Sequence, residues 1–225
     1  MRLLVLEHQA DAPAGLLGDW ASERGHEMTV TRVAEASVLP EPRDGDVLVS
    51  LGSDHSLAGP REDWIDGELE VLRRAHDAGR PVLGICFGGQ ALAAALGGEV
   101  RRAPRVAIEW SRLDTQRPDL VGGGPWFRWH EDEFSVPDGA QQIARAGDVA
   151  MAFVSNAAVG LQFHPEVTAP IAEQWIAGAG RQLATAALEE GHVRERISSG
   201  LAGAPERAYE LFDALARLWQ EQGLV

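Results

Sequence analysis

The sequence predicts an α/β protein with three layers, in which a mostly parallel central sheet carries helices on both faces. Short apolar runs rich in branched residues alternate with helical patterns through the first 100 residues. The strands expected in this part are Arg2–Leu6, Met28–Val33, Asp46–Leu51 and Pro81–Ile85. Strands that alternate with helices are joined by crossovers, which make the strands parallel and place the helices on the faces of the sheet.

Residues Glu62–Ala78 have the clearest helical pattern between two of these strands. Apolar residues recur there at helical spacing, at Ile65, Leu69, Leu72 and Ala75. Glu70 and Arg74 stand four residues apart, where an ion pair supports a helix. Gly79 and Pro81 follow, and they predict the end of the helix.

The rest of the chain adds strands and then becomes helical after Pro170. The further strands expected are Val106–Leu113, Ala150–Val154 and Val159–Phe163. The segment Gly122–Gly124 with Pro125 is expected to form a loop. We expect residues 1–176 to form a single α/β domain and residues 177–225 to form a helical extension packed on the same domain.

The helix expected behind Pro205 carries one apolar stripe. Its members are Ala208, Leu211, Phe212, Leu215, Leu218 and Trp219. Such a stripe either docks on the parent domain or binds a partner, and docking is the commoner outcome.

Composition excludes several kinds of protein. The 225 residues carry a net charge of −14 and include one cysteine, Cys86, and no lysine. One cysteine allows neither an intrachain disulfide framework nor a CxxC site, and the absence of lysine removes a P-loop lysine and a Schiff-base lysine. The acidic balance argues against binding to nucleic acid or to an anionic membrane. No spacing typical of a metal site occurs, such as HExxH, and we expect no metal and no cofactor.

The sequence shows neither a targeting segment nor a membrane span. The apolar run Leu3–Leu6 is too short for a signal peptide, and nothing approaches the roughly 18 apolar residues of a membrane span. We therefore expect a cytoplasmic protein with no membrane partner.

The most informative segment places the cysteine between a strand and a helix. Gly84-Ile-Cys86-Phe-Gly88 follows an apolar strand and precedes an alanine-rich helix, which is the pattern of a nucleophile elbow. Glycine tolerates the strained, crowded turn. The helix N-terminus favours the thiolate there, and the backbone N–H of Phe87 can donate to an oxyanion. A lone cysteine is more often a small buried apolar residue, so the assignment needs a second observation.

The second observation is Phe163-His164-Pro-Glu166 at the end of another strand. A cysteine nucleophile requires a base, and the base requires a carboxylate that fixes its tautomer; His164 and Glu166 can provide these groups. An arbitrary His-Pro-Glu sequence is more often a solvated loop. Both segments, however, stand at the carboxyl ends of strands, where open α/β sheets place their sites.

These two segments resemble the motifs of the class I, triad-type glutamine amidotransferases, Gly-[Ile/Val/Leu]-Cys-x-Gly-x-Gln and His-Pro-Glu. The resemblance implies a flavodoxin-like fold, with Cys86 as the nucleophile, His164 as the base and Glu166 as its orienting partner. It also implies that Gln90, in the first turn of the helix, contacts the substrate glutamine.

Two further stretches resemble this family, and the second of them resembles its stand-alone, GMP-synthetase-like members. Leu51-Gly52-Ser53 occupies the place of a Gly-Gly-Pro loop, which implies an oxyanion hole made by the N–H groups of Gly52 and Phe87. Leu51 and Ser53 depart from that motif. A Trp-His-x-Asp segment that lines the substrate pocket in the family is matched by Trp129, His130 and Asp132.

The resemblance implies a cysteine-dependent enzyme that hydrolyses the side-chain amide of glutamine through a Cys86 thioester and delivers ammonia to a separate synthase subunit. An alternative is a stand-alone γ-glutamyl peptidase or hydrolase acting on a γ-glutamyl conjugate. A third alternative is a catalytically silent binding subunit of the same fold, which the altered residues Leu51 and Ser53 leave open.

Other conspicuous residues have simpler interpretations. His8 and Asp11 either line the mouth of the site or are solvated loop residues, and the second is the commoner case. His76 is expected on an exposed helix face. Trp126, Phe127 and Trp129 form either a docking patch or a part of the core.

Overall fold

The computed structural model describes the backbone of residues 1–225 and every side chain except those of Arg181 and Thr185. The parallel part of its central sheet runs, in spatial order, through β2 (Glu27–Arg32), β1 (Arg2–Glu7), β3 (Asp46–Ser50), β4 (Val82–Ile85) and β10 (Ala158–Leu161). Antiparallel strands continue the sheet beyond β10, namely β9 (Val149–Ser155), β8 (Gln141–Ala146) and β6 (Asp114–Thr115). A separate antiparallel pair consists of β5 (Val100–Ser111) and β7 (Trp126–Phe134).

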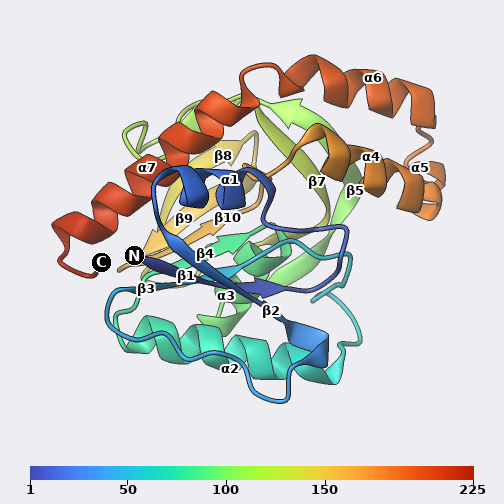
Figure 1. The fold of residues 1–225 in the computed structure, drawn as a ribbon. Helices are drawn as coiled ribbons and strands as arrows, with labels where there is room; N and C mark the ends of the chain where they lie inside the picture. The colour runs from blue at the N-terminus through green and yellow to red at the C-terminus, as the bar shows by residue number, and fades with distance from the viewer.

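Helices cover both faces of the central sheet (Figure 1). One face carries α1 (Gly15–Glu23) and α7 (Ala204–Glu221), and the other carries α2 (Asp63–Asp77) and α3 (Phe87–Ala95). The β5–β7 pair is covered by α4 (Ala169–Gly178) and α6 (Glu190–Leu201), with the short α5 (Gly180–Thr185) between them in sequence. A short 3₁₀ helix, η1 (Val33–Glu35), follows β2.

The strands divide their apolar side chains between two cores. Leu3 and Val5 of β1 pack with α1 and α7, whereas Leu4 and Leu6 pack with α2 and α3. Successive side chains of a strand point to opposite faces, so a continuous apolar run is buried on both sides. The predicted three-layer α/β class is therefore confirmed. No helix among the residues with described placement is both long and apolar enough to span a bilayer.

The β5–β7 pair is where the fold differs most from expectation. The strand expected at Val106–Leu113 begins at Val100, and a register shift between Arg102 and Ala107 interrupts its pairing. No strand was expected at Trp126–Phe134, because charged residues break its apolar pattern. Tertiary pairing with β5 buries these residues together with their polar partners.

The predicted C-terminal stripe docks on the parent sheet. Leu211, Phe212, Leu215 and Trp219 of α7 are buried in the same core as the strands β1, β3 and β4. The expected division between residues 176 and 177 stays a prediction.

Candidate active site

Cys86 lies in the sharp turn between β4 and α3. Its backbone has φ 51° and ψ −105°, a sparsely populated conformation of the kind found at functional sites. The Cys86 N–H donates to Leu161 O at 2.8 Å, and the Gln90 N–H donates to Cys86 O at 2.9 Å. A Cβ atom on Gly88 would lie 2.0 Å from Ser50 O, so α3 can cross β3 only at a glycine. The elbow expected from the sequence is present.

His164 lies just beyond the end of β10 and is held at its backbone and at its ring. Its N–H donates to Phe127 O at 2.8 Å, and its ring Nδ1 lies 2.7 Å from Glu166 Oε1. His164 and Glu166 are 4% and 2% exposed. The carboxylate accepts from Nδ1–H and thereby fixes the orientation of the imidazole ring.

Cys86 and His164 meet at one backbone carbonyl. Cys86 Sγ lies 3.6 Å from Trp129 O, and His164 Nε2 lies 3.3 Å from the same oxygen. Gly52 lies beside both residues, because a Cβ atom there would be 3.0 Å from His164 Cε1 and 4.0 Å from Cys86 Cβ. The fold thus brings together the predicted nucleophile, base and loop glycine from three segments of the chain.

The pKa of His164 is raised well above its usual value. Burial of the ring lowers this pKa, but the charges of Cys86 and Glu166 and hydrogen bonds with both residues outweigh the burial. A raised pKa favours the imidazolium, which is the form that can give a proton to a leaving group.

A cavity of about 320 Å³ lies against Cys86 and His164. Small-molecule sites range over roughly 300–1,000 Å³, so this cavity is of a size for a ligand such as an amino acid. The lining residues are Gln9, Asp11, Ala12, Gly52, Ser53, Asp54, His55, Ser56, Cys86, Gln90, Arg102, Trp129, His130, Glu131, Asp132, His164, Trp175, Gly178, Ala179 and Gln182.

The residues predicted to contact the substrate all line this cavity. Gln90 Nε2 donates to Asp132 O at 3.0 Å, and Asp132 Oδ2 accepts from Ser56 Oγ at 2.6 Å. The Arg102 guanidinium lies 3.3 Å from Asp132 Oδ1. One wall of the cavity is therefore a hydrogen-bonded unit built around a buried carboxylate.

His130 holds this wall rather than presenting a free nitrogen. Its Nδ1–H donates to Asp132 O at 3.0 Å, and its Nε2 accepts from Arg128 Nε at 3.2 Å. Burial lowers the pKa of His130 to about 3, and the charges on Arg128 and His164 add to this effect. No group of three or more His, Cys, Asp or Glu side chains suited to a metal ion occurs among the described residues.

Phe87 and Glu166 lie outside the cavity lining. Phe87 is the first residue of α3 and its side chain is buried, so the prediction for it concerns its backbone N–H. The prediction for Glu166 concerns its contact with His164 Nδ1.

One part of the cavity wall carries no signal in the sequence. The Trp175 ring lies 4.7 Å from the His164 ring, centroid to centroid. Gln182 Oε1 accepts from Trp129 Nε1 at 2.8 Å. Both residues come from α4 and α5, whose sequences carry no motif, and only the packing of these helices on β7 places them here.

Several minor expectations are corrected by burial. His8 is a buried residue whose Nε2 lies 2.9 Å from Glu68 Oε2, and not a solvated loop residue. His76 is largely covered, and its Nε2 lies 2.9 Å from Ser155 Oγ. The three aromatic residues expected either in a docking patch or in the core are in the core, namely Trp126, Phe127 and Trp129.

Comparison with known proteins identifies the family. Residues 21–176 match the family profile described as glutamine amidotransferase class-I. The chain belongs to this family. It is 29% identical over 201 residues to the glutamine amidotransferase-like protein YfeJ of Salmonella typhimurium, covering 83% of this chain and 84% of that protein. It is also 30% identical over 174 residues to the GMP synthase (glutamine-hydrolyzing) of Aeropyrum pernix, covering 70% of this chain but only 33% of that protein.

Solved structures share the fold of this chain. A glutamine amidotransferase from Thermotoga maritima aligns with a TM-score of 0.84 at 23% identity, over 96% of this chain and 97% of that one. A glutamine amidotransferase from Methylobacillus flagellatus aligns with a TM-score of 0.82 at 24% identity, over 96% and 94% of the two chains. The shared fold therefore includes helices beyond residue 176.

Proposed function

We propose that this amidotransferase hydrolyses the side-chain amide of glutamine through a thioester on Cys86. The observation that carries the proposal is the meeting of Cys86 Sγ and His164 Nε2 at Trp129 O, with Glu166 on the far side of the imidazole and an amino-acid-sized cavity beside them. Cys86, His164 and Glu166 act in this proposal as the catalytic triad.

The first half of the reaction forms the thioester. The Cys86 thiolate attacks the side-chain carbonyl carbon of glutamine, and the carbonyl oxygen becomes an oxyanion that accepts hydrogen bonds from the Gly52 and Phe87 N–H groups. The C–N bond then breaks while the His164 imidazolium gives its proton to the departing nitrogen. Ammonia leaves, and the glutamyl group stays on sulfur.

The second half returns the enzyme to its starting state. His164, now neutral, takes a proton from water as that water attacks the thioester carbon. The carbon–sulfur bond breaks, glutamate is released, and the Cys86 thiolate again lies beside an imidazolium. Gln90, Trp129, His130 and Asp132 form the wall that would hold the glutamine.

The ammonia has a use only if an acceptor is close. The Aeropyrum pernix relative is named as a GMP synthase, and two thirds of that protein lie outside its match to this chain. We therefore assign the acceptor chemistry to a separate synthase subunit.

A second candidate is the hydrolysis of a γ-glutamyl conjugate. It is favoured by Gln9, Asp11 and Gln182, which line the cavity, have no role in the steps above and could contact a substituent on the amide nitrogen. The same chemistry would then release an amine in place of ammonia.

Glutamate release tests these proposals. Glutamine and a panel of γ-glutamyl amides and dipeptides are offered to the wild type, to Cys86→Ala and to His164→Gln, with His192→Gln as the matched control because His192 is 74% exposed. We expect both site variants to lose activity by a factor on the order of 10³ or more, and the control to keep it. Full activity of Cys86→Ala would overturn the site.

Substrate preference separates the two candidates. Faster release from glutamine supports the amidotransferase, and faster release from a conjugate supports the second candidate. Covalent labelling of Cys86 by 6-diazo-5-oxo-L-norleucine, read by mass, excludes a silent binding subunit; an unlabelled, folded protein would contradict both catalytic proposals.

A further inference from the structure

His8 is a buried histidine that the proposed mechanism does not use. It follows β1 directly, and its side chain and that of Glu68 are both 0% exposed. Its Nε2 lies 2.9 Å and 3.1 Å from the two oxygens of Glu68, and its Nδ1 lies 3.2 Å from Gly52 O. The ring therefore connects α2 to the glycine beside Cys86 and His164.

Glu68 is also held from a third side. Ser50 Oγ at the end of β3 donates to Glu68 Oε1 at 2.6 Å. Gly52 O is an acceptor, so His8 Nδ1 must carry a proton, and a second proton lies between Nε2 and the carboxylate. Replacing a buried polar pair of this kind by apolar residues of similar volume is often neutral or stabilising, so stability alone does not account for it. Its use is better sought in what it holds.

The His8–Glu68 pair contacts residues 51–56, which contain the proposed oxyanion donor Gly52. We call residues 51–56 the oxyanion loop. Leu51 O accepts from the Gly88 N–H at 3.0 Å, and Gly52 O accepts from His8. A trans peptide is planar and its N–H points opposite to its C=O. The Gly88 bond to Leu51 O therefore fixes the direction of the Gly52 N–H, and the His8 bond to Gly52 O fixes the peptide of Ser53 that follows, so that Gly52 is restrained on both sides.

The second proposed donor rests against the same imidazole. The Phe87 ring packs edge-on to the His8 ring with centroids 4.9 Å apart, and Trp64 stacks on His8 at 5.3 Å. One side chain thus contacts both residues whose N–H groups would bind the oxyanion.

The loop has no proline to stiffen it, and hydrogen bonds from residues 8 and 9 restrain it instead. Gln9 Oε1 accepts from the Asp54 N–H at 2.8 Å and from Ser53 Oγ at 3.3 Å. We propose that His8 and Glu68 are positioning residues, which set the oxyanion loop so that the Gly52 and Phe87 N–H groups converge on one point. This inference rests on the proposed function.

Two variants at one position separate the two bonds of the ring. In His8→Asn the amide nitrogen takes the place of Nδ1, and it keeps the bond to Gly52 O but not the one to Glu68. In His8→Gln the amide nitrogen takes the place of Nε2, and it keeps the bond to Glu68 but not the one to Gly52. His192→Gln is the exposed control, Glu68→Met removes the anchor at similar volume, and the melting temperature of each variant is recorded.

We expect His8→Gln to lower kcat for glutamine by roughly 10- to 100-fold with KM almost unchanged, because the oxyanion exists only after attack. Binding of L-glutamate γ-semialdehyde, which forms a tetrahedral adduct on sulfur, should weaken by a similar factor, whereas product glutamate should bind as before. His8→Asn should retain most of the activity. Equal losses in both variants that follow their melting temperatures would overturn the proposal.

Hydrogen exchange of residues 51–56 tests the positioning role of His8 and Glu68 without reference to activity. We expect faster exchange in His8→Gln and Glu68→Met than in the wild type and His8→Asn. If the wild type hydrolyses no substrate but exchange behaves in this way, the proposed function is wrong, and the restraint of the loop by His8 and Glu68 is supported. If exchange is unchanged in every variant, His8 and Glu68 do not restrain the loop, even if the proposed function is correct.

Discussion

At Gly52 the candidate active site leaves no room for a single methyl group. A Cβ atom there would lie 3.0 Å from His164 Cε1, and the ring has little freedom to give way because Glu166 and Trp129 O hold its two nitrogens. Contacts this short force a shift of a few tenths of an ångström. Gly52 is therefore required for packing in addition to its proposed N–H.

We expect Gly52→Ala to lower kcat by roughly 10- to 100-fold, because a small displacement of His164 misaligns proton transfer. Gly59→Ala is the matched control, since Gly59 lies in the same connection, is exposed and has no neighbour within 4 Å of an added Cβ. Steady-state kinetics on both proteins makes the comparison. Equal activity of the two variants would show that His164 tolerates the methyl group.

His130 affects the pH dependence of the stability of the fold, because its pKa differs between the folded and unfolded states. The pKa of His130 falls to about 3 in the folded protein, mainly because the ring is buried. In the unfolded chain a histidine takes up a proton below a pH of about 6.5. The unfolded state therefore binds more protons between these limits, and His130 lowers the stability of the fold as the pH drops.

We expect His130→Asn, whose amide can still donate to Asp132 O, to lack this loss of stability at low pH. The free energy of unfolding of the wild type should fall relative to that of the variant by about 2 kcal/mol between pH 7 and pH 5. Urea unfolding at several pH values measures the difference. Parallel curves for the two proteins would mean that His130 is protonated in the fold.

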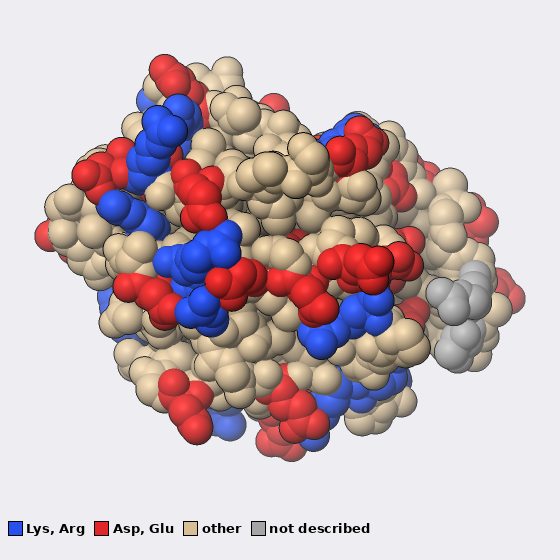
Figure 2. Space-filling view, turned by 90° about the horizontal axis from the view of Figure 1, so that it is seen from below, with Lys and Arg blue, Asp and Glu red and all other residues tan. Residues whose placement is uncertain are grey.

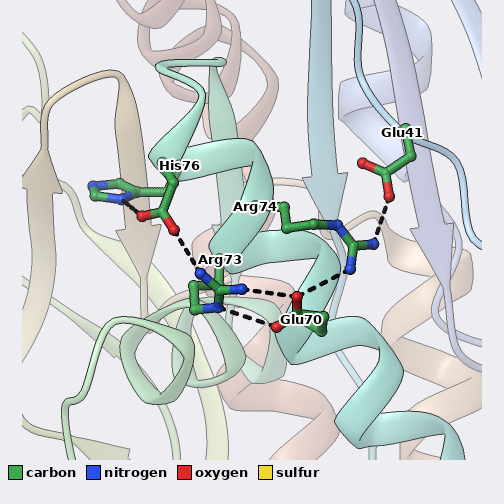
Figure 3. Close-up of polar contacts among 6 residues, drawn as sticks. Glu41, Glu70, Arg73, Arg74 and His76 are labelled. Carbon is green, nitrogen blue, oxygen red and sulfur yellow. Dashed lines mark hydrogen bonds and ion pairs between the residues drawn. The ribbon is translucent and has the colours of Figure 1, made fainter.

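At the scale of single elements, α2 shows how surface charge is used. Arg73 and Arg74 both contact Glu70, and Arg74 also reaches Glu41 in the connection between β2 and β3 (Figure 3). Acidic and basic side chains are interspersed over this side of the molecule (Figure 2). Exposed pairs of this kind contribute about 0–1 kcal/mol each, so they orient a loop more than they stabilise the fold.

The contact between α6 and β5 is closely packed around a glycine. Gly200 of α6 lies on the Trp110 ring, where an added Cβ would come 2.2 Å from Cε2. Trp110 Nε1 also donates to Ile197 O at 3.0 Å. The glycine thus permits the close approach of helix and strand.

We expect Gly200→Ala to destabilise the fold by roughly 1–3 kcal/mol, because overpacking outweighs the gain of up to about 1 kcal/mol in helix propensity. Gly67→Ala in α2 is the control: Gly67 is exposed with nothing within 4 Å of an added Cβ, and alanine there should raise the melting temperature. Thermal unfolding of both variants measures the two effects. Stabilisation by both substitutions would contradict the close packing at Trp110.

At the scale of the whole molecule, α7 completes the core begun by β1. Trp219 is 2% exposed and donates through Nε1 to Ala157 O at 2.9 Å. Leu3, Val47 and Leu83 belong to the same core as this helix. The last helix therefore covers a sheet whose strands come from the other end of the chain.

We expect Trp219→Ala to destabilise the whole domain by roughly 3–5 kcal/mol, and to lower Tm by several degrees per kcal/mol lost. The unfolding should stay a single transition by far-UV and near-UV circular dichroism, because α7 and the sheet share one core. Gln220→Ala changes the exposed neighbour and should have little effect. Two separate transitions would show instead that the C-terminal helices form a unit of their own.

Most of the layer architecture followed from the chain itself. Apolar runs such as Arg2–Leu6 and the helical spacing of Ile65, Leu69 and Leu72 were sufficient, because a buried strand and an amphipathic helix have distinct periods. The β7 strand was missed, since its charged residues are compatible with burial only through distant partners such as Ser56 for Asp132. Partners of this kind are not visible in a local pattern.

By itself, the sequence determined the elbow at Cys86 and the ends of the strands around it. These features depend on neighbours in the chain: glycine admits the strained turn, and a short branched apolar run makes the strand. Only the tertiary structure decided which distant groups meet there, namely His8 with Glu68 and Gly52, and the α4 and α5 residues that close the cavity. The reason is physical, because a buried polar group is stable only with a partner, and the path of the folded chain selects that partner.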